Sequence, residues 1–168
     1  MRFRATIGIM ALAASCLALA GGGSAAAQAS STCTWGGTPA SPTGRFTVSP
    51  GLTNTPAPEP LKFSATGVLA GGGRCTGQMT LAGQVNAGST CLLASFEGTV
   101  RGVPGVARFW GAGSALVHEF LYDKDGNLVG ADQPSVGPPP ADDPLYINCN
   151  SPQGETDLSF SAIVELFE

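Results

Sequence analysis

Apolar and polar residues alternate along several stretches of this 168-residue chain. The alternation has a period of two residues, which is typical of strands with one buried face. Glycine-containing turns separate the stretches, and a strand with its turn takes roughly 12 to 16 residues, as in an antiparallel meander. The pattern predicts an all-β domain, either an antiparallel sandwich or a barrel. The predicted strands are Leu61–Leu69, Cys75–Gly83, Cys91–Val100, Val106–Gly111, Ser114–Asp125, Leu145–Cys149 and Thr156–Phe167.

One of these stretches is ambiguous. Ser114–Asp125 is partly apolar on both faces, so a short helix is the alternative to a strand. The stretch ends at Asp125-Gly126, a dipeptide that favours a tight hairpin turn, and we therefore prefer the strand. Gly130–Pro144 is rich in proline and includes Pro138, Pro139 and Pro140, which predicts a long loop.

The segment before the predicted strands has a different composition. Residues 30–60 are rich in Thr, Pro, Gly and Ser, and Arg45–Val48 is the only short strand candidate among them. We expect an irregular arm over residues 30–60, held by Cys33, and regular structure from Leu61 onward. Residues 61–168 then form a single all-β domain.

Composition supports a β-fold over a helical one. The chain holds 24 Gly and 13 Pro, and only 12% of its residues are charged. Gly and Pro cost about 1 and 3 kcal/mol inside a helix, so their spread along the chain disfavours helical bundles and coiled coils.

The first 29 residues have the pattern of a secretory signal peptide. Arg2 and Arg4 precede the apolar run Ile7–Ala20, and small residues that suit cleavage follow. The run is shorter than the roughly 20 residues of a membrane-spanning helix. Cys16 raises a competing interpretation, a lipid anchor at that residue, although the apolar run continues past it.

Four cysteines follow this leader. An even number in an exported chain predicts two disulfides, and no two are spaced as in a structural zinc site. Cys75 and Cys91 begin successive antiparallel strands, which places them at opposite ends of a hairpin and disfavours a bond between them. We predict Cys33–Cys75 with Cys91–Cys149, and the pairing Cys33–Cys91 with Cys75–Cys149 remains open.

Charge is distributed unevenly. Ten acidic residues and one Lys lie between Glu119 and Glu168, whereas basic residues outnumber acidic ones between Ser30 and His118. The formal net charge of the whole chain is -4, which argues against nucleic acid as a partner. The acidic half serves solubility or attracts a cationic partner or a loosely held metal ion.

Several strand and turn motifs resemble a known group of proteins. Ser95–Gly98, Gly105–Gly111, Leu121–Gly130 and Ser161–Leu166 are similar to segments of small secreted actinobacterial proteins with no assigned activity. The resemblance covers most of the chain after the leader. It implies an extracellular all-β protein and assigns no functional residue.

Three residues are the candidates for catalysis. His118 is the only histidine, but no G-x-S-x-G or H-E-x-x-H motif surrounds it. Glu97 and Glu119 lie within predicted strands and would form a glycosidase-type pair if both faced one cleft. For each of the three, a strand residue without a catalytic role is the simpler interpretation.

Two further groups are candidates for binding. Asp123, Asp125 and Asn127 match the first three ligand positions of a calcium loop, but the glycine and the final glutamate of that loop are missing. A hairpin turn explains them better. Trp35 and Trp110 would serve as an aromatic platform for sugars or as packing residues.

No catalytic or cofactor motif is complete, so the sequence predicts no cofactor. Our first hypothesis is a secreted, non-catalytic binding or structural module with an unknown extracellular partner. The alternatives are a small hydrolase that uses Glu97 or Glu119 and a protease inhibitor that presents the 130–144 loop.

Overall fold

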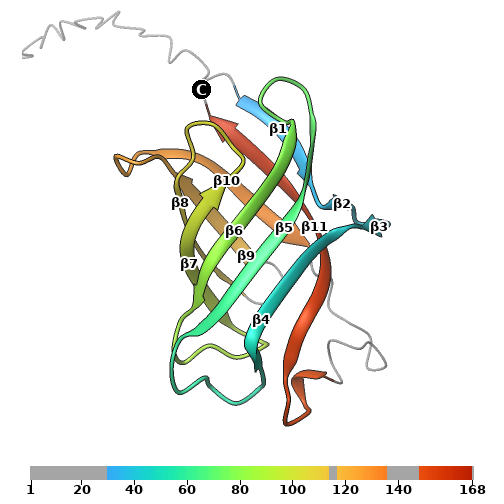
Figure 1. The fold of residues 1–168 in the computed structure, drawn as a ribbon, viewed down its shortest axis with the longest axis vertical. Coiled ribbons are helices and arrows are strands. Elements are labelled where there is room, and N and C mark those ends of the chain that lie inside the picture. The colour runs from blue at the N-terminus through green and yellow to red at the C-terminus, as the bar shows by residue number, and fades with distance from the viewer. Residues whose placement is uncertain (1–29, 114–116, 136–147, 168) are drawn as a thin grey trace, which may run out of the picture.

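The structure is a computed structural model that describes residues 30–113, 117–135 and 148–167. Its described strands form an antiparallel barrel with eight strand positions (Figure 1). The predicted all-β class is therefore confirmed, and the barrel is the correct alternative to a sandwich. Among the described residues, no helix is long and apolar enough to cross a membrane.

Seven of the eight positions are single strands joined in sequence order by antiparallel pairing. Each strand alternates residues that face the barrel interior with residues that face outward. These strands are β5 (Leu61–Gly71), β6 (Gly77–Val85), β7 (Ala94–Arg101), β8 (Arg108–Gly113), β9 (Val117–Tyr122), β10 (Leu128–Ser135) and β11 (Glu155–Phe167).

The eighth position is shared by two strands lying end to end. β1 (Ser30–Trp35) pairs with the C-terminal half of β11 and the end of β5, and β4 (Gly44–Leu52) pairs with the N-terminal half of β11 and the start of β5. A small hairpin of β2 (Gly37–Thr38) and β3 (Ser41–Pro42) lies between them (Figure 1). Together β1 and β4 close the barrel.

This closure corrects the expectation that regular structure begins at Leu61. The segment 30–60 is not an irregular arm, because about half of it, β1 and β4, belongs to the barrel wall. Its many Gly and Pro residues disfavour strands, and pairing with β5 on one side and β11 on the other supplies the missing stability.

Two other expectations need correction. Residues 130–135 of the predicted proline-rich loop belong to β10, where Pro134 lies opposite Ala162, and the rest of that loop lies outside the described residues. Cys149 lies in a short helical turn rather than a strand. The predicted signal peptide, with Cys16, also lies outside the described residues.

The barrel interior is packed with apolar side chains. Phe46, Phe63, Phe96 and Phe109 form an aromatic cluster with ring centroids 5.4–6.1 Å apart. Both predicted disulfides are present: Cys33–Cys75 at one end of the barrel and Cys91–Cys149 at the other. The hairpin argument against a Cys75–Cys91 bond is therefore confirmed.

Candidate functional site

Two acidic side chains face each other inside the barrel. Glu119 on β9 and Asp132 on β10 are direct cross-strand partners. Glu119 alternates with exposed His118 and Phe120 and shares its face with fully buried Leu121, so it points inward. The exposed fractions of Glu119 and Asp132 are only 6% and 3%. We call these two residues the acid pair.

The neighbouring strands make room for the acid pair. Gly111 on β8 lies opposite Glu119, and a Cβ atom at this glycine would lie 2.5 Å from Glu119 Cγ. On the other side, Asp132 lies opposite Val164 of β11, which is fully buried. The glutamate side chain thus occupies space that any larger residue at position 111 would fill.

Most oxygens of the acid pair lack a hydrogen-bond partner. Glu119 Oε2 and both carboxyl oxygens of Asp132 are buried, and no donor from any other described residue reaches them. The third buried acidic residue of the described chain, Glu155, differs in this respect, because it accepts hydrogen bonds from Asn148 Nδ2 and the Asp157 amide. Buried polar groups are normally paired, so the acid pair is an exception that calls for a functional explanation.

Burial also changes the protonation of the acid pair. Loss of hydration raises the pKa of Asp132 well above its ordinary value of 3.8, and the charge of Glu119 and a hydrogen bond to it raise it further. The pKa of Glu119 is raised by burial as well, although its hydrogen bond with Asp132 lowers it in part. Two carboxylates contain no donor, so this hydrogen bond requires a proton. We conclude that Asp132 holds the proton and donates it to Glu119.

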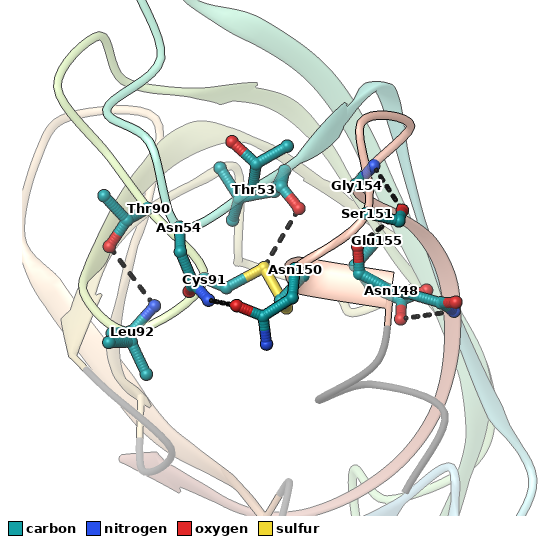
Figure 2. The surroundings of a disulfide bond; sticks show 12 residues. Thr53, Asn54, Thr90, Cys91, Leu92, Asn148, Asn150, Ser151, Gly154 and Glu155 are labelled. Atoms are coloured by element: carbon teal, nitrogen blue, oxygen red, sulfur yellow. Dashed lines mark hydrogen bonds between the residues drawn. A yellow bond between two sulfur atoms is a disulfide. The ribbon is translucent and has the colours of Figure 1, made fainter.

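The acid pair lies near the end of the barrel that carries the Cys91–Cys149 disulfide. Glu119 is the third residue of β9, and Asp132 is three residues from the end of β10. At this end, Asn54 Nδ2 donates to Asn150 Oδ1 at 2.9 Å (Figure 2). The Cys91 amide donates to the Thr53 carbonyl. The bridge and these bonds tie three loop segments together beside the strand ends.

The two glutamates proposed as a catalytic pair do not share a cleft. Glu119 faces the interior, whereas Glu97 on β7 is exposed on the outer surface, where it accepts a hydrogen bond from Gln84 Nε2 at 2.7 Å. The barrel wall separates their carboxyl groups. His118 faces outward and is exposed.

Asp123, Asp125 and Asn127 form the hairpin turn between β9 and β10. The Asp123 carboxylate accepts hydrogen bonds from the amides of Asp125 and Asn127 and from Asn127 Nδ2, at 2.8–2.9 Å. These bonds lower the pKa of Asp123, the side-chain bond from Asn127 having the largest effect. The preferred strand is confirmed over Val117–Tyr122, residues 114–116 lie outside the described residues, and the hairpin turn at Asp125-Gly126 is confirmed.

The two tryptophans lie in different environments and do not form one platform. Trp35 is buried, and its Nε1 donates to the carbonyls of Gly67 and Met79 at 3.2 Å. Trp110 on β8 is 43% exposed on the outer surface and stacks on Phe120 with the ring planes 15° apart. Only Trp110 is available to a ligand.

Sequence reasoning identified Glu119 but not Asp132. Glu119 was a candidate because it lies within a predicted strand, and since both faces of that strand are partly apolar, the sequence did not show which way it points. Asp132 was assigned to a loop, so its pairing with Glu119 went unnoticed. Within the described ranges, no group of three or more His, Cys, Asp and Glu residues converges as a metal site would require.

The chain has no match among known proteins that would suggest a role for the acid pair. No protein-family model, curated protein or solved structure matches it.

Proposed function

We propose that the protein is a secreted, non-catalytic binding module that takes a small amine-bearing ligand at the acid pair. The observation that carries this proposal is that three buried oxygens of Glu119 and Asp132 receive no hydrogen bond from any other described residue. A positively charged donor group would satisfy them. Secretion rests on the leader pattern of residues 1–29, and two disulfides are compatible with it.

The energetics favour a functional role over a structural one. A buried polar group without a partner typically costs about 1–3 kcal/mol. Replacing buried charged groups by well-packed apolar residues is often neutral or stabilising. An acid pair to which no other residue donates a hydrogen bond therefore destabilises the empty barrel, and such a cost is typical of binding sites.

The chemistry of the acid pair favours an ammonium group. An ammonium carries three N–H donors and a positive charge, and both match adjacent carboxyl groups. The apolar side chains around the pair, including Phe96 and Val164, suit an aliphatic body on the ligand. A divalent metal is a weaker candidate, because the pair offers only two protein side chains and metal sites usually recruit three or more.

A second candidate function is the hydrolase, now with Asp132 in place of Glu97. Burial raises the pKa of Asp132 well above its ordinary value of 3.8, which is the direction that a general acid requires. Two observations favour binding. The carboxyl groups share a hydrogen bond, whereas a retaining glycosidase holds its pair about 5 Å apart on either side of the scissile bond. The inhibitor hypothesis depends on a loop that is mostly outside the described residues.

The test measures whether an amine displaces the shared proton. Hexylammonium is titrated into the protein by calorimetry at pH 7 in two buffers that differ in ionisation enthalpy, with 1-hexanol as the uncharged control. We expect binding of hexylammonium with release of about one proton, because the incoming cation takes the place of the proton in the pair. Hexanol should bind more weakly and release none.

The variant carrying Glu119→Gln and Asp132→Asn provides the matched control. It retains the shape of both side chains but has no proton to release, so hexylammonium binding should fall at least tenfold. Absence of hexylammonium binding to the wild type, or equal binding to the variant, would refute the proposal. Hydrolysis of a glycoside substrate that this variant abolishes would favour the second candidate instead.

A further inference from the structure

A groove crosses the outer wall of the barrel, on the side opposite to the interior face of the strands. It runs over β5 to β9 and has a volume of about 930 Å³, within the range of ligand sites in proteins. Its floor is the backbone of β6 and β7, where Gly83 and Gly98 lie opposite each other. The side chains that define it are Lys62, Gln84, Glu97, Arg108, Trp110 and Tyr122.

The groove lies on a cationic part of the surface. Arg45, Lys62, Arg101 and Arg108 are all exposed on the outer face of β4 to β8. Strands that follow one another along the chain are neighbours in this barrel. The excess of basic residues in the first half of the sequence is therefore gathered on one side of the barrel surface. Glu97 is the only acidic residue within these five strands, and Gln84 already donates a hydrogen bond to it.

An aromatic ring forms one side of the groove. Trp110 is the cross-strand partner of Glu97 on β7 and of Phe120 on β9. Its stack with Phe120 holds the indole ring in place while 43% of the residue stays exposed. An exposed aromatic face next to amide and charged side chains suits a sugar ring, which presents C–H groups on one face and hydroxyls around its edge.

We propose that this groove binds an acidic polysaccharide. Trp110 stacks on a sugar ring, Gln84 and Tyr122 contact hydroxyl groups, and Lys62 and Arg108 pair with carboxylate groups along the chain. Charge complementarity selects an acidic over a neutral polysaccharide, because the groove has two cations and one carboxylate that is already hydrogen-bonded. The proposal is independent of the acid pair, which faces the other side of the wall.

The experiment measures binding of polygalacturonate, with dextran as the neutral polymer and single-stranded DNA as an acidic polymer without sugar rings accessible for stacking. Affinity electrophoresis at 20 and 150 mM NaCl reports both affinity and its salt dependence. We expect polygalacturonate to retard the protein and dextran to have no effect. Added salt should weaken binding, because exposed charges are screened.

Matched variants distinguish binding in the groove from nonspecific attraction between the polymer and the charged protein surface. Trp110→Ala should weaken polygalacturonate binding at least tenfold, and Lys62→Gln with Arg108→Gln should weaken it and reduce its salt dependence. Lys124→Gln and Ile163→Ala are the controls, since Lys124 lies in the β9–β10 turn and Ile163 is an exposed apolar residue on β11. Both should bind within twofold of the wild type.

Three results would overturn the proposal. They are no binding of polygalacturonate, an equal loss in the Lys124→Gln control, or equally tight DNA binding that Trp110→Ala leaves unchanged. Thermal unfolding of each variant shows whether it is folded. If Trp110→Ala does not fold, the polygalacturonate affinity of the double variant Lys62→Gln, Arg108→Gln decides whether the proposal holds.

Discussion

Asp132 lies directly opposite Glu119 inside the barrel because of a single irregularity in the β9–β10 hairpin. Tyr122 pairs with Leu128 next to the turn, but the register shifts between Leu128 and Gly130. Without this bulge, Ala131 would lie opposite Glu119 and Asp132 would face outward, since a shift of one residue exchanges the two faces of a strand. The bulge therefore brings the second carboxyl group into the interior.

The acid pair makes stability depend on pH in a specific direction. Both groups have a folded-state pKa above the ordinary values of 3.8 and 4.5. Below those values both are protonated in the folded and the unfolded chain, so the contribution is constant. As pH rises from about 4 through the folded-state pKa values, the unfolded chain loses its protons first and the folded protein is progressively destabilised.

We therefore predict that Asp132→Asn flattens this part of the pH profile. The asparagine amide still donates to Glu119, as the protonated aspartate does. The free energy of unfolding of the wild type, relative to the variant, should fall as the pH rises from 5 to 8, because the raised pKa of Asp132 is absent from the variant. Urea unfolding at several pH values measures the difference. The lowered pKa of Asp123 has the opposite effect on the pH dependence of stability. Because Asp123 is present in both proteins, its effect cancels in the difference between their free energies of unfolding.

Gly111→Ala should destabilise the protein through Glu119. The new Cβ would lie 2.5 Å from Glu119 Cγ and 3.1 Å from the His118 carbonyl oxygen. Overpacking of this kind typically costs about 1–3 kcal/mol. Adding Glu119→Ala should restore part of the loss, because it removes the atom in closest contact. A double-mutant cycle on the free energy of unfolding gives the coupling, and strictly additive effects would show that glycine is needed here for another reason.

Removing either disulfide should lower the free energy of unfolding by about 2–4 kcal/mol, as is typical for loops of this size. The bridges span 42 and 58 residues for Cys33–Cys75 and Cys91–Cys149, so their effects on stability should be similar. Their effects on hexylammonium binding should differ. Only the Cys91→Ser, Cys149→Ser variant loosens the loops at the end nearest the acid pair, and calorimetry should show weaker binding for it alone.

The two tryptophans should respond differently to the same substitution. Trp35→Phe removes an N–H that donates to two buried carbonyls, and we expect a loss of about 1–3 kcal/mol. Trp110→Phe replaces an exposed ring and should change stability by no more than about 0.5 kcal/mol. Chemical unfolding of both variants provides the comparison. Equal losses would contradict the assignment of Trp35 to the core and Trp110 to the surface.

Much of the fold was predictable because one face of most strands is buried. The alternation in Leu61–Leu69 and Thr156–Phe167 identified β5 and β11, and the hairpin argument identified the disulfides. The short strand predicted at Arg45–Val48 is confirmed within β4, but the rest of β4 and all of β1 were missed, because their stability comes from strands that are distant in sequence. This is a tertiary effect that local composition does not reveal.

The candidate site was predictable only in part. Glu119 lies within a predicted strand, but both faces of that strand are partly apolar, so its inward orientation was not visible in the sequence. The position of Asp132 depends on the bulge after Leu128. The residues Leu128–Gly130 show no pattern from which this one-residue shift of register could be predicted.

The most direct test of the central claim is a carbon-13 NMR titration of the side-chain carboxyl groups in the wild-type protein. Asp132→Asn and Glu119→Gln provide the assignments. We expect two coupled transitions, at least one of them well above the ordinary carboxyl range, showing that the acid pair keeps a proton to a higher pH than free carboxyl groups do. Two carboxyl groups that both titrate at or below their ordinary values of 3.8 and 4.5 would contradict it, because the pair would then share no proton once the pH exceeds those values.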